Sequence, residues 1–101
     1  MSDCGLLEAL RVAELITKGT RSIVLRSEDG TGVFAASRPR VCMRLSGGRV
    51  HLTVRVRVLT PHSRVTRVDY RSGDHGLLLS VPYPRADVLP GDVLVQSVPV
   101  S

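Results

Sequence analysis

The alternation of apolar and basic residues between positions 38 and 58 is the feature that most constrains the fold. Apolar residues occupy every second position of its second half: Val50, Leu52, Val54, Val56 and Val58. A period of two is typical of a β-strand with one buried face. The first half, residues 40–45, alternates in the same way, and Gly47-Gly48 separates the two runs. Because glycine readily adopts positive φ, the sequence predicts a β-hairpin that turns at these two glycines.

This loop predicts the register of the hairpin. Leu45 is expected to face Val50, Met43 to face Leu52, and Val41 to face Val54. On the other side, the same register pairs Arg44 with His51, Cys42 with Thr53, Arg40 with Arg55, and Arg38 with Arg57. A slip of one residue would mix the two faces, so the register is strongly specified. We name the basic set the arginine strip: Arg38, Arg40, Arg44, His51, Arg55 and Arg57.

Residues 3–18 are predicted to form a helix. Ser2 or Asp3 is suited to cap its start, and Gly19 is well placed to end it. One helical face is apolar and comprises Leu6, Ala9, Leu10, Ala13 and Ile16, while Glu8, Arg11, Glu14 and Lys18 lie largely opposite. Leu7 and Leu15 fall on the charged side, where they are either simply exposed or contact a partner.

Strands at hairpin spacing follow the helix. Residues 21–27 and 31–37 predict a hairpin around Asp29-Gly30, with Leu25 facing Phe34 and Ile23 facing Ala36. Residues 60–63 are predicted to form a turn. Residues 64–71 are predicted to form a strand whose register the alternation does not define. Residues 77–79 with Val81 are predicted to form a strand buried on both faces. Pro82, Pro84 and Pro90 are expected to interrupt regular structure after residue 81. A last strand is expected around residues 93–98.

Together these elements predict a mainly β (α+β) fold. The chain of 101 residues suits one domain, residues 1–101, with the helix at 3–18 and an antiparallel β region at 21–100. About six or seven strands are expected, without crossover helices between them, which excludes a parallel α/β architecture. The sheet is expected to curl, to close as a small barrel, or to pack under the helix.

The charge of the chain is unevenly distributed. Residues 38–71 hold nine arginines and one acid, Asp69, for a net charge of +8. The rest holds four arginines, Lys18 and eight acids, for −3, and the two parts sum to the overall +5. This asymmetry favours an anionic partner for the middle of the chain. Codon bias in a GC-rich genome would explain arginine in place of lysine, but it does not explain the clustering.

The setting is predicted to be cytoplasmic. No apolar run approaches the length of a membrane-spanning helix, and the N-terminus lacks the pattern of a secretory signal. Cys4 and Cys42 are too few for a disulfide framework, which favours a reducing, intracellular compartment.

No motif of an enzyme is found. Candidate nucleophiles are Ser63 and Cys42, candidate bases are the three histidines, and Asp69 or Asp74 could orient them, but no nucleophile signature surrounds these residues. Asp74-His75 lies in a glycine-flanked loop, where a solvated turn is the default. Paired zinc ligands and a phosphate-binding glycine loop are also missing from the sequence. We therefore expect a non-enzymatic protein without a metal or cofactor.

One stretch resembles a known family. The segment from Pro39 to Pro61, with its Gly-Gly hairpin and valine-rich second strand, is similar to the middle of alkaline-shock-type envelope stress proteins from actinobacteria. The family has a long helix after this hairpin, which the present sequence does not indicate. Any alternating hairpin would match equally well, so neither fold nor function is carried over.

Two functions of different classes are compatible with the sequence. The leading hypothesis is binding of nucleic acid through its phosphates by the arginine strip, with little preference for base sequence. The alternative is a protein-assembly module, such as a subunit of a homo-oligomer or of a larger complex. Its arginines would meet acids of a neighbour, and Leu7, Leu15 or the 77–79 strand would make apolar contacts. In a third interpretation the strip has no partner. Its arginines are then either solvated or neutralised within the chain by Glu8, Glu14, Glu28 or Asp87.

Overall fold

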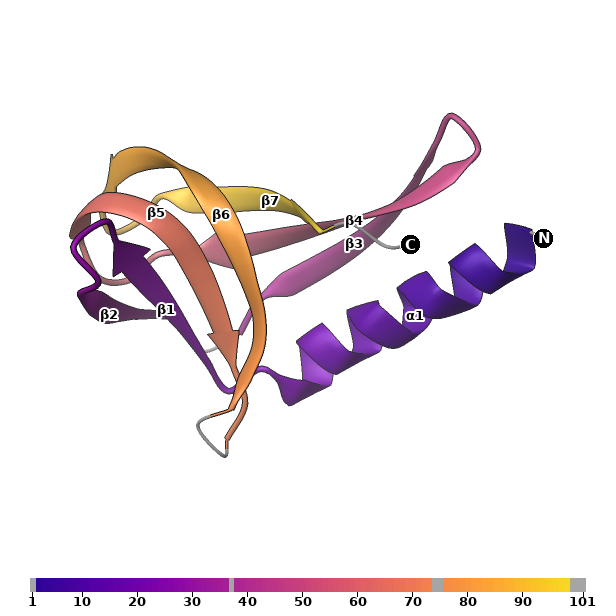
Figure 1. Ribbon diagram of the computed structural model, residues 1–101, viewed down its shortest axis with the longest axis horizontal. Coiled ribbons are helices and arrows are strands. Elements are labelled where there is room, and N and C mark those ends of the chain that lie inside the picture. The colour runs from indigo at the N-terminus through magenta and orange to yellow at the C-terminus, as the bar shows by residue number, and fades with distance from the viewer. Residues whose placement is uncertain (1, 37, 74–75, 99–101) are drawn as a thin grey trace.

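The protein has one N-terminal helix followed by strands that pair antiparallel in two sheets (Figure 1). A computed structural model describes residues 2–36, 38–73 and 76–98. Its elements are α1 (Ser2–Gly19), β1 (Ser22–Ser27), β2 (Gly32–Ala36), β3 (Arg40–Ser46), β4 (Arg49–Arg57), β5 (His62–Arg71), β6 (Leu77–Val88) and β7 (Val93–Val98). The predicted mainly β (α+β) class is therefore confirmed.

The two sheets face each other without closing into a barrel. The first has the strand order β2-β1-β5-β6 and the second the order β3-β4-β7. One junction between them is made by backbone, since the Leu59 amide donates to the Ala35 carbonyl at 2.9 Å. The structure thus realises the predicted curled arrangement as two packed sheets, and the small-barrel alternative is not formed.

The other junction, between β6 and β7, depends on one buried side chain. The Gln96 amide on β7 donates to the Val81 and Pro82 carbonyls on β6 at 3.5 and 3.3 Å. The Tyr70 hydroxyl donates to the Gln96 Oε1 at 2.7 Å. Because Pro82 and Pro84 lack an N–H, β6 is poorly suited to a further backbone ladder. Gln96 therefore supplies the polar contact that a ladder would otherwise make.

The central hairpin forms in the predicted register over its whole paired length. The pairs run from Ser46 opposite Arg49 to Arg40 opposite Arg55. Gly47 and Gly48 have φ of 58° and 75°, as a two-residue turn with both central residues at positive φ requires.

The predicted pair between Arg38 and Arg57 is wrong. Strand β3 begins at Arg40, and the buried Pro39 precedes it. Proline has no N–H to donate, so it is typical of a strand boundary. Arg57 instead pairs on its other side with Val93 of β7.

The first hairpin turns through three residues rather than two. The Ser27 amide donates to the Thr31 carbonyl at 2.8 Å, and Gly30 has φ of 90°. A residue at positive φ that closes a three-residue loop is the usual alternative to a two-residue turn. The predicted pair of Ile23 with Ala36 is confirmed, but Leu25 faces Val33 and not Phe34. A register shift between Ile23 and Val24 reconciles the two.

Strand β6 contradicts the prediction of a strand buried on both faces. It is an edge strand that pairs only with β5, and Leu77 is 54% exposed. It also continues through Pro82 and Pro84, which were read as breaks. Proline is tolerated on edge strands, because one side of the backbone needs no partner there.

Strand β5 begins earlier than predicted, at His62, so the turn before it is shorter. The register shifts twice between His62 and Arg67, and Arg64 adopts φ of 52°, which is uncommon outside glycine. These irregularities explain why Val65 and Val68 are both buried although they differ in parity.

The helix has the predicted extent within one residue at each end. Ala9 and Ile16 are buried, and Leu7 and Leu15 are exposed, as expected. Leu6 and Leu10, which were predicted to be buried, are 39% and 46% exposed. In Figure 1 the N-terminal half of α1 extends, alongside the β3–β4 hairpin, beyond the region where the two sheets overlap. The predicted cap residues lie outside the described side chains.

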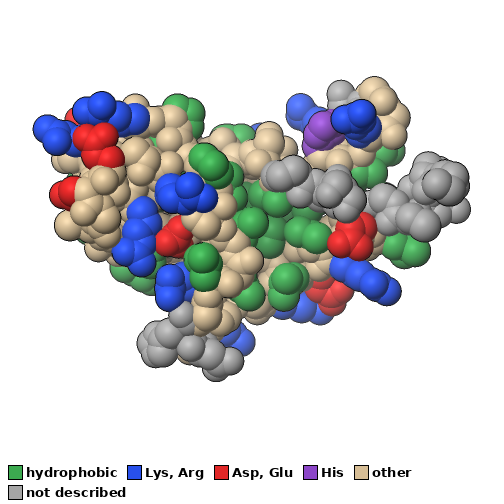
Figure 2. Space-filling view, viewed as in Figure 1, with side chains coloured by type: hydrophobic (Ala, Val, Ile, Leu, Met, Phe, Trp, Pro, Cys, Tyr) green, Lys and Arg blue, Asp and Glu red, His purple; other side chains and the backbone are tan. Residues whose placement is uncertain are grey.

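The core lies between the two sheets and under the C-terminal half of α1. The inward side chains of β4 are fully buried at Leu52, Val54 and Val56. The outer end of the hairpin extends beyond the core, and there Leu45 is 73% exposed. Figure 2 shows apolar side chains at the surface between the helix and the hairpin. Among the described residues, no helix is long and apolar enough to cross a membrane.

Candidate anion-binding surface

The arginine strip lies on the outer face of the three-stranded sheet, with one exception. Arg40 and Arg44 from β3, and His51, Arg55 and Arg57 from β4, are all exposed. Directly paired residues of an antiparallel sheet project from the same face, so these side chains form one surface. Arg49, at the start of β4, has the same parity and extends this surface, although it was not predicted as a site residue.

Strand β7 is the third strand of this surface. Its residues Val93, Val95 and Ser97 pair with Arg57, Arg55 and Thr53 respectively. A shallow pocket of about 480 Å³ runs across the three strands, and its lining comprises Cys42, Met43, Arg44, Thr53, Arg55, Val95 and Ser97. This lining contains two arginines and no acid. The sequence alone did not indicate that β7 lies on this face, because β7 pairs with a strand that is far away from it in the sequence.

Three of the four acids that were candidates to neutralise the strip, Glu14, Glu28 and Asp87, have other partners. Glu14 pairs with Lys18 at 2.8 Å, and this hydrogen bond and charge hold the pKa of Glu14 below its usual value. Glu28 pairs with Arg64 and Arg85 at 3.7 and 3.4 Å. Asp87 accepts a hydrogen bond from the Arg64 amide at 3.0 Å. Within residues 2–36, 38–73 and 76–98, no ion pair joins the strip to an acid.

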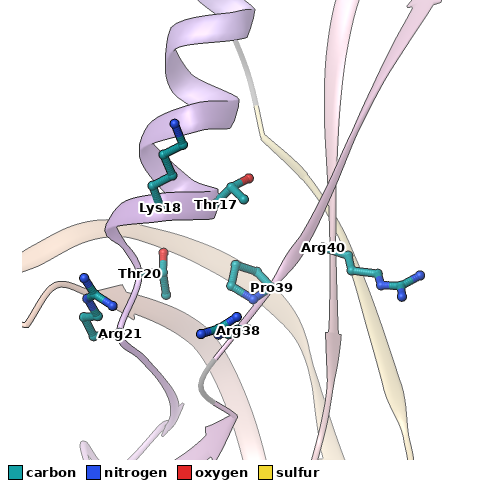
Figure 3. A pocket seen from close by; sticks show the side chains of 7 residues that line it. All are labelled: Thr17, Lys18, Thr20, Arg21, Arg38, Pro39 and Arg40. Carbon is teal, nitrogen blue, oxygen red and sulfur yellow. The ribbon is translucent and has the colours of Figure 1, made fainter.

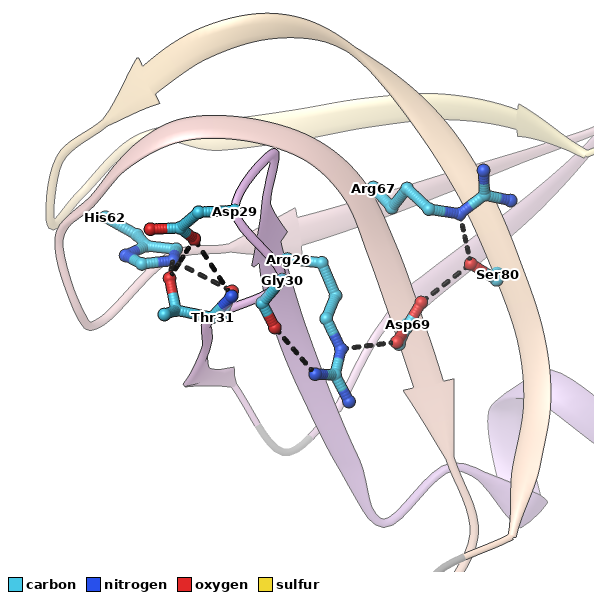
Figure 4. Close-up of polar contacts among 8 residues, drawn as sticks. All are labelled: Arg26, Asp29, Gly30, Thr31, His62, Arg67, Asp69 and Ser80. Atoms are coloured by element: carbon cyan, nitrogen blue, oxygen red, sulfur yellow. Dashed lines mark hydrogen bonds and ion pairs between the residues drawn. The ribbon is translucent and has the colours of Figure 1, made fainter.

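Eight of the nine arginines of residues 38–71 lie on strands, and these are divided between two sheets. Arg64, Arg67 and Arg71 belong to β5, in the four-stranded sheet. There Arg67 donates to Ser80, and Ser80 donates to Asp69 at 2.7 Å (Figure 4). Asp69 also pairs with Arg26 at 3.0 Å. Fewer arginines therefore cluster on one surface of the folded protein than the sequence of residues 38–71 suggests.

Arg38 leaves the strip and lines a separate pocket of about 570 Å³. This pocket lies between the end of α1 and the start of β3, and its lining comprises Thr17, Lys18, Thr20, Arg21, Arg38, Pro39 and Arg40 (Figure 3). Four of these residues are cationic and none is acidic. The Thr20 hydroxyl is buried without a hydrogen-bond partner among the described residues. Leaving a buried hydroxyl unpaired costs about 1–3 kcal/mol. The helix and the strand come together only in the fold, so no local pattern indicated that Lys18, Thr20 and Arg21 share a site with Arg38.

Of the residues considered for nucleophilic catalysis, Ser63 and His62 line one polar depression, but no hydrogen bond joins them among the described residues. Asp69 bonds to Arg26 and Ser80, as described above, and not to a histidine. His62 lies instead within 3.3 Å of the Thr31 carbonyl (Figure 4). Cys42 is exposed and faces Thr53 on the outer face of the hairpin. Asp74 and His75 lie outside the described residues.

A second polar depression surrounds His62. The Thr31 hydroxyl donates to Asp29 Oδ1 at 2.7 Å, and hydrogen bonds from the Thr31 side chain and backbone hold the pKa of Asp29 below its usual value. This depression also contains Asp87, so its carboxylates make it unsuited to an anion. No group of three or more potential metal ligands occurs within the part of the chain that the structure describes.

The hairpin that carries the resemblance to the envelope stress proteins is explained by its own geometry. Strand β4 leads to β5 through a short turn, and no helix intervenes. The sequence matches no protein-family model, and comparisons with curated proteins and with solved structures found no similar chain.

Proposed function

We propose that the protein binds nucleic acid through the phosphate backbone, using the outer face of the β3-β4-β7 sheet. The observation that carries this proposal is the exposed set of Arg40, Arg44, Arg55 and Arg57, for which no acidic partner occurs among the described residues. Guanidinium groups stay protonated at every physiological pH and suit phosphate oxygens bidentately.

The arrangement of the strip has an energetic consequence. Arg40 and Arg55 face each other directly, which places two like charges on neighbouring strands. Such a pair destabilises a sheet by about 0.2–1 kcal/mol. A phosphate between the two guanidinium groups would reverse the sign of this interaction. A binding partner thus offers a physical reason for an arrangement that the isolated fold does not need.

Binding of nucleic acid is expected to depend little on the base sequence. The surface carries few amide side chains, and its neighbours on β7 are Val93, Val95 and Ser97. No Phe, Tyr or Trp lies on β3, β4 or β7, and His51 is the one ring that these strands place on this face, so bases have little to stack on. Phosphate contacts position a protein on nucleic acid without reading the bases.

The test is a fluorescence titration against generic duplex DNA and RNA at several salt concentrations. Each phosphate contact releases condensed counterions, so the logarithm of the affinity falls linearly with the logarithm of the salt concentration. If about four arginines contact phosphates, the slope is expected to be about −4 for a duplex. Absence of binding at low salt would refute the proposal.

A second candidate function is protein assembly, with another copy of this chain as the partner. The observation that favours it is apolar surface on α1 and the hairpin: Leu6, Leu7, Leu10, Leu15, Met43 and Leu45 are all exposed. Exposed apolar side chains on neighbouring elements are what an interface would cover. In this case the arginines would pair with acids of the neighbouring copy, and the association would persist when nucleic acid is removed.

A further inference from the structure

The pocket at the end of α1 is a second concentration of positive charge, apart from the strip. Three chain segments meet there: the last turn of the helix, the Thr20-Arg21 connection to β1, and the Arg38–Arg40 segment that opens β3. Its lining contains no acid. Charges from separate segments were brought together by the fold, and so their mutual repulsion is a cost that the folded protein bears.

The buried hydroxyl of Thr20 is the second observation. Thr20 is only 4% exposed, and its Oγ1 has no hydrogen-bond partner among the described residues. The Thr20 amide, in contrast, is satisfied by the Ile16 carbonyl at 3.3 Å. Buried polar atoms are nearly always paired, so an unpaired one in a cationic pocket points to a missing ligand.

Figure 3 shows how the cations lie around Thr20, whose hydroxyl points toward the end of α1. The side chains of Arg21 and Arg38 lie on either side of Thr20, whereas Arg40 points away across the strand. Lys18 is directed toward Glu14, with which it pairs at 2.8 Å. The pocket lining thus combines the guanidinium groups of Arg21 and Arg38 with the Thr20 hydroxyl.

We infer that this pocket is a discrete binding site for a phosphate group. Each guanidinium can donate two parallel N–H bonds to phosphate oxygens, and the Thr20 hydroxyl can donate a further one. Two forks and a hydroxyl together supply five hydrogen bonds, which exceeds the roughly four acceptor sites on the two oxygens of a carboxylate, whereas the three terminal oxygens of a phosphate monoester can accept all five. Arg21 and Arg38 are exposed, long side chains, so they can reorient and close over a ligand that reaches Thr20.

The inference does not depend on the proposed function of the strip. The strip is an open face that suits many phosphates of a polymer, while this pocket takes a single phosphate group. That group is either free phosphate or the terminal phosphate of a nucleic acid, and the two sources share the same chemistry. Arg38 belongs to this pocket and not to the paired strip, so variants can separate the two sites.

The experiment is a titration of the ¹⁵N-labelled full chain with inorganic phosphate at constant ionic strength, with chloride as the compensating anion. We expect saturable shifts of the Thr20, Arg21 and Arg38 amides with one-to-one stoichiometry. Arg21→Gln and Arg38→Gln should each weaken the affinity at least tenfold. Thr20→Val should weaken it severalfold, whereas Thr20→Ser, which keeps the hydroxyl, should bind as wild type does.

The matched control is Arg11→Gln, which removes one charge from an exposed position of α1 outside both proposed sites and should leave phosphate affinity unchanged. Thr20→Val has a second readout, since removing an unpaired buried hydroxyl should keep or raise the melting temperature while it lowers phosphate affinity. An affinity lowered equally by Arg11→Gln would overturn the inference, as would the absence of saturable shifts.

A structural role for the two arginines predicts a different pattern. Cations near the end of a helix interact favourably with its free carbonyls. If that were their only role, Arg21→Gln and Arg38→Gln would lower the melting temperature without any phosphate-dependent effect, and the inference would fail.

The source of the phosphate is tested with oligonucleotides that carry either a 5′-phosphate or a 5′-hydroxyl. A tighter complex with the phosphorylated end, lost in Arg38→Gln, identifies a nucleic-acid terminus. Saturable binding of inorganic phosphate without any end preference identifies a small phosphate compound, and it leaves the pocket established even if the strip binds no nucleic acid. Equal binding of both ends without any binding of inorganic phosphate refutes the pocket but not the strip.

Discussion

Neighbouring residues of β4 have opposite environments, which provides the sharpest test at the level of single side chains. Val54 is fully buried, whereas Thr53 projects from the outer face beside the arginine strip. Val54→Asp should destabilise the fold by roughly 4 kcal/mol or more, because it buries an unpaired charge. Thr53→Asp should fold normally and weaken nucleic-acid binding, because it places a carboxylate among the arginines.

Thermal melts and the duplex titration measure both effects on the same pair of variants. Similar melting temperatures for the two variants would mean that the assignment of the inner and outer faces of β4 is wrong. A Thr53→Asp protein that folds and still binds duplex as wild type does would count against the strip as the binding surface.

The Tyr70 hydroxyl gives a pH-dependent prediction. Burial raises the pKa of Tyr70 above the ordinary value of 10.0. Above about pH 10 the unfolded chain loses this proton while the folded chain retains it, so the free energy of unfolding falls by about 1.4 kcal/mol per pH unit. Below the unfolded pKa the contribution is fully present. Tyr70→Phe should remove this component and flatten the alkaline decline in denaturant unfolding.

The same variant tests the junction between the sheets. Without the Tyr70 hydroxyl, the buried Gln96 Oε1 loses its donor, which should cost about 1–3 kcal/mol near neutral pH. Tyr83→Phe, on edge strand β6, is the matched control for loss of a hydroxyl and should change the neutral stability far less. A Tyr70→Phe protein as stable as wild type would show that the Tyr70–Gln96 bond is not needed to join β6 to β7.

At the level of elements, the paired strands β3 and β4 predict a separation of binding from stability. Replacing Arg40 and Arg55 together by Gln should flatten the salt dependence of duplex binding by about two. The fold should be as stable as before or slightly more stable, because a facing like-charge pair is removed. Melts and titrations of the double variant measure the two quantities.

The control removes the same net charge elsewhere, with Arg11→Gln on α1 and Arg85→Gln on β6. This control should bind duplex with nearly the wild-type slope. An Arg40/Arg55 variant that melts much lower than wild type would show that these arginines are held by contacts within the protein. A variant that binds as wild type does would refute the nucleic-acid proposal.

For the whole molecule, the two candidate functions predict different masses in solution. Phosphate-directed binding predicts a complex with nucleic acid at low salt that dissociates as salt rises. Assembly through the apolar surface of α1 predicts an oligomer that resists salt and dissociates when Leu7 and Leu15 are both replaced by Glu. Light scattering at low and high salt, with and without duplex, distinguishes the two outcomes.

The sequence alone was sufficient to predict the central hairpin, its register and its basic outer face. These features depend on an alternation of period two and on two adjacent glycines, which act within a few residues of each other. The helix was also predicted within one residue at each end, since its amphipathic pattern and Gly19 are local signals. The first hairpin was missed by one residue in its loop, because Asp-Gly suits both a two-residue turn and the third position of a longer one.

The tertiary structure decided which of these residues meet. Arg38 was predicted to continue the strip, but Pro39 ends the ladder, and the packing of α1 places Arg38 beside Arg21 and Thr20. Three further arginines of the basic segment belong to β5 and the other sheet. Strand β6 became an edge because of strand order, which depends on pairings between distant residues. A periodic pattern determines the face on which a side chain lies, but only the packing of distant elements determines what lies opposite it.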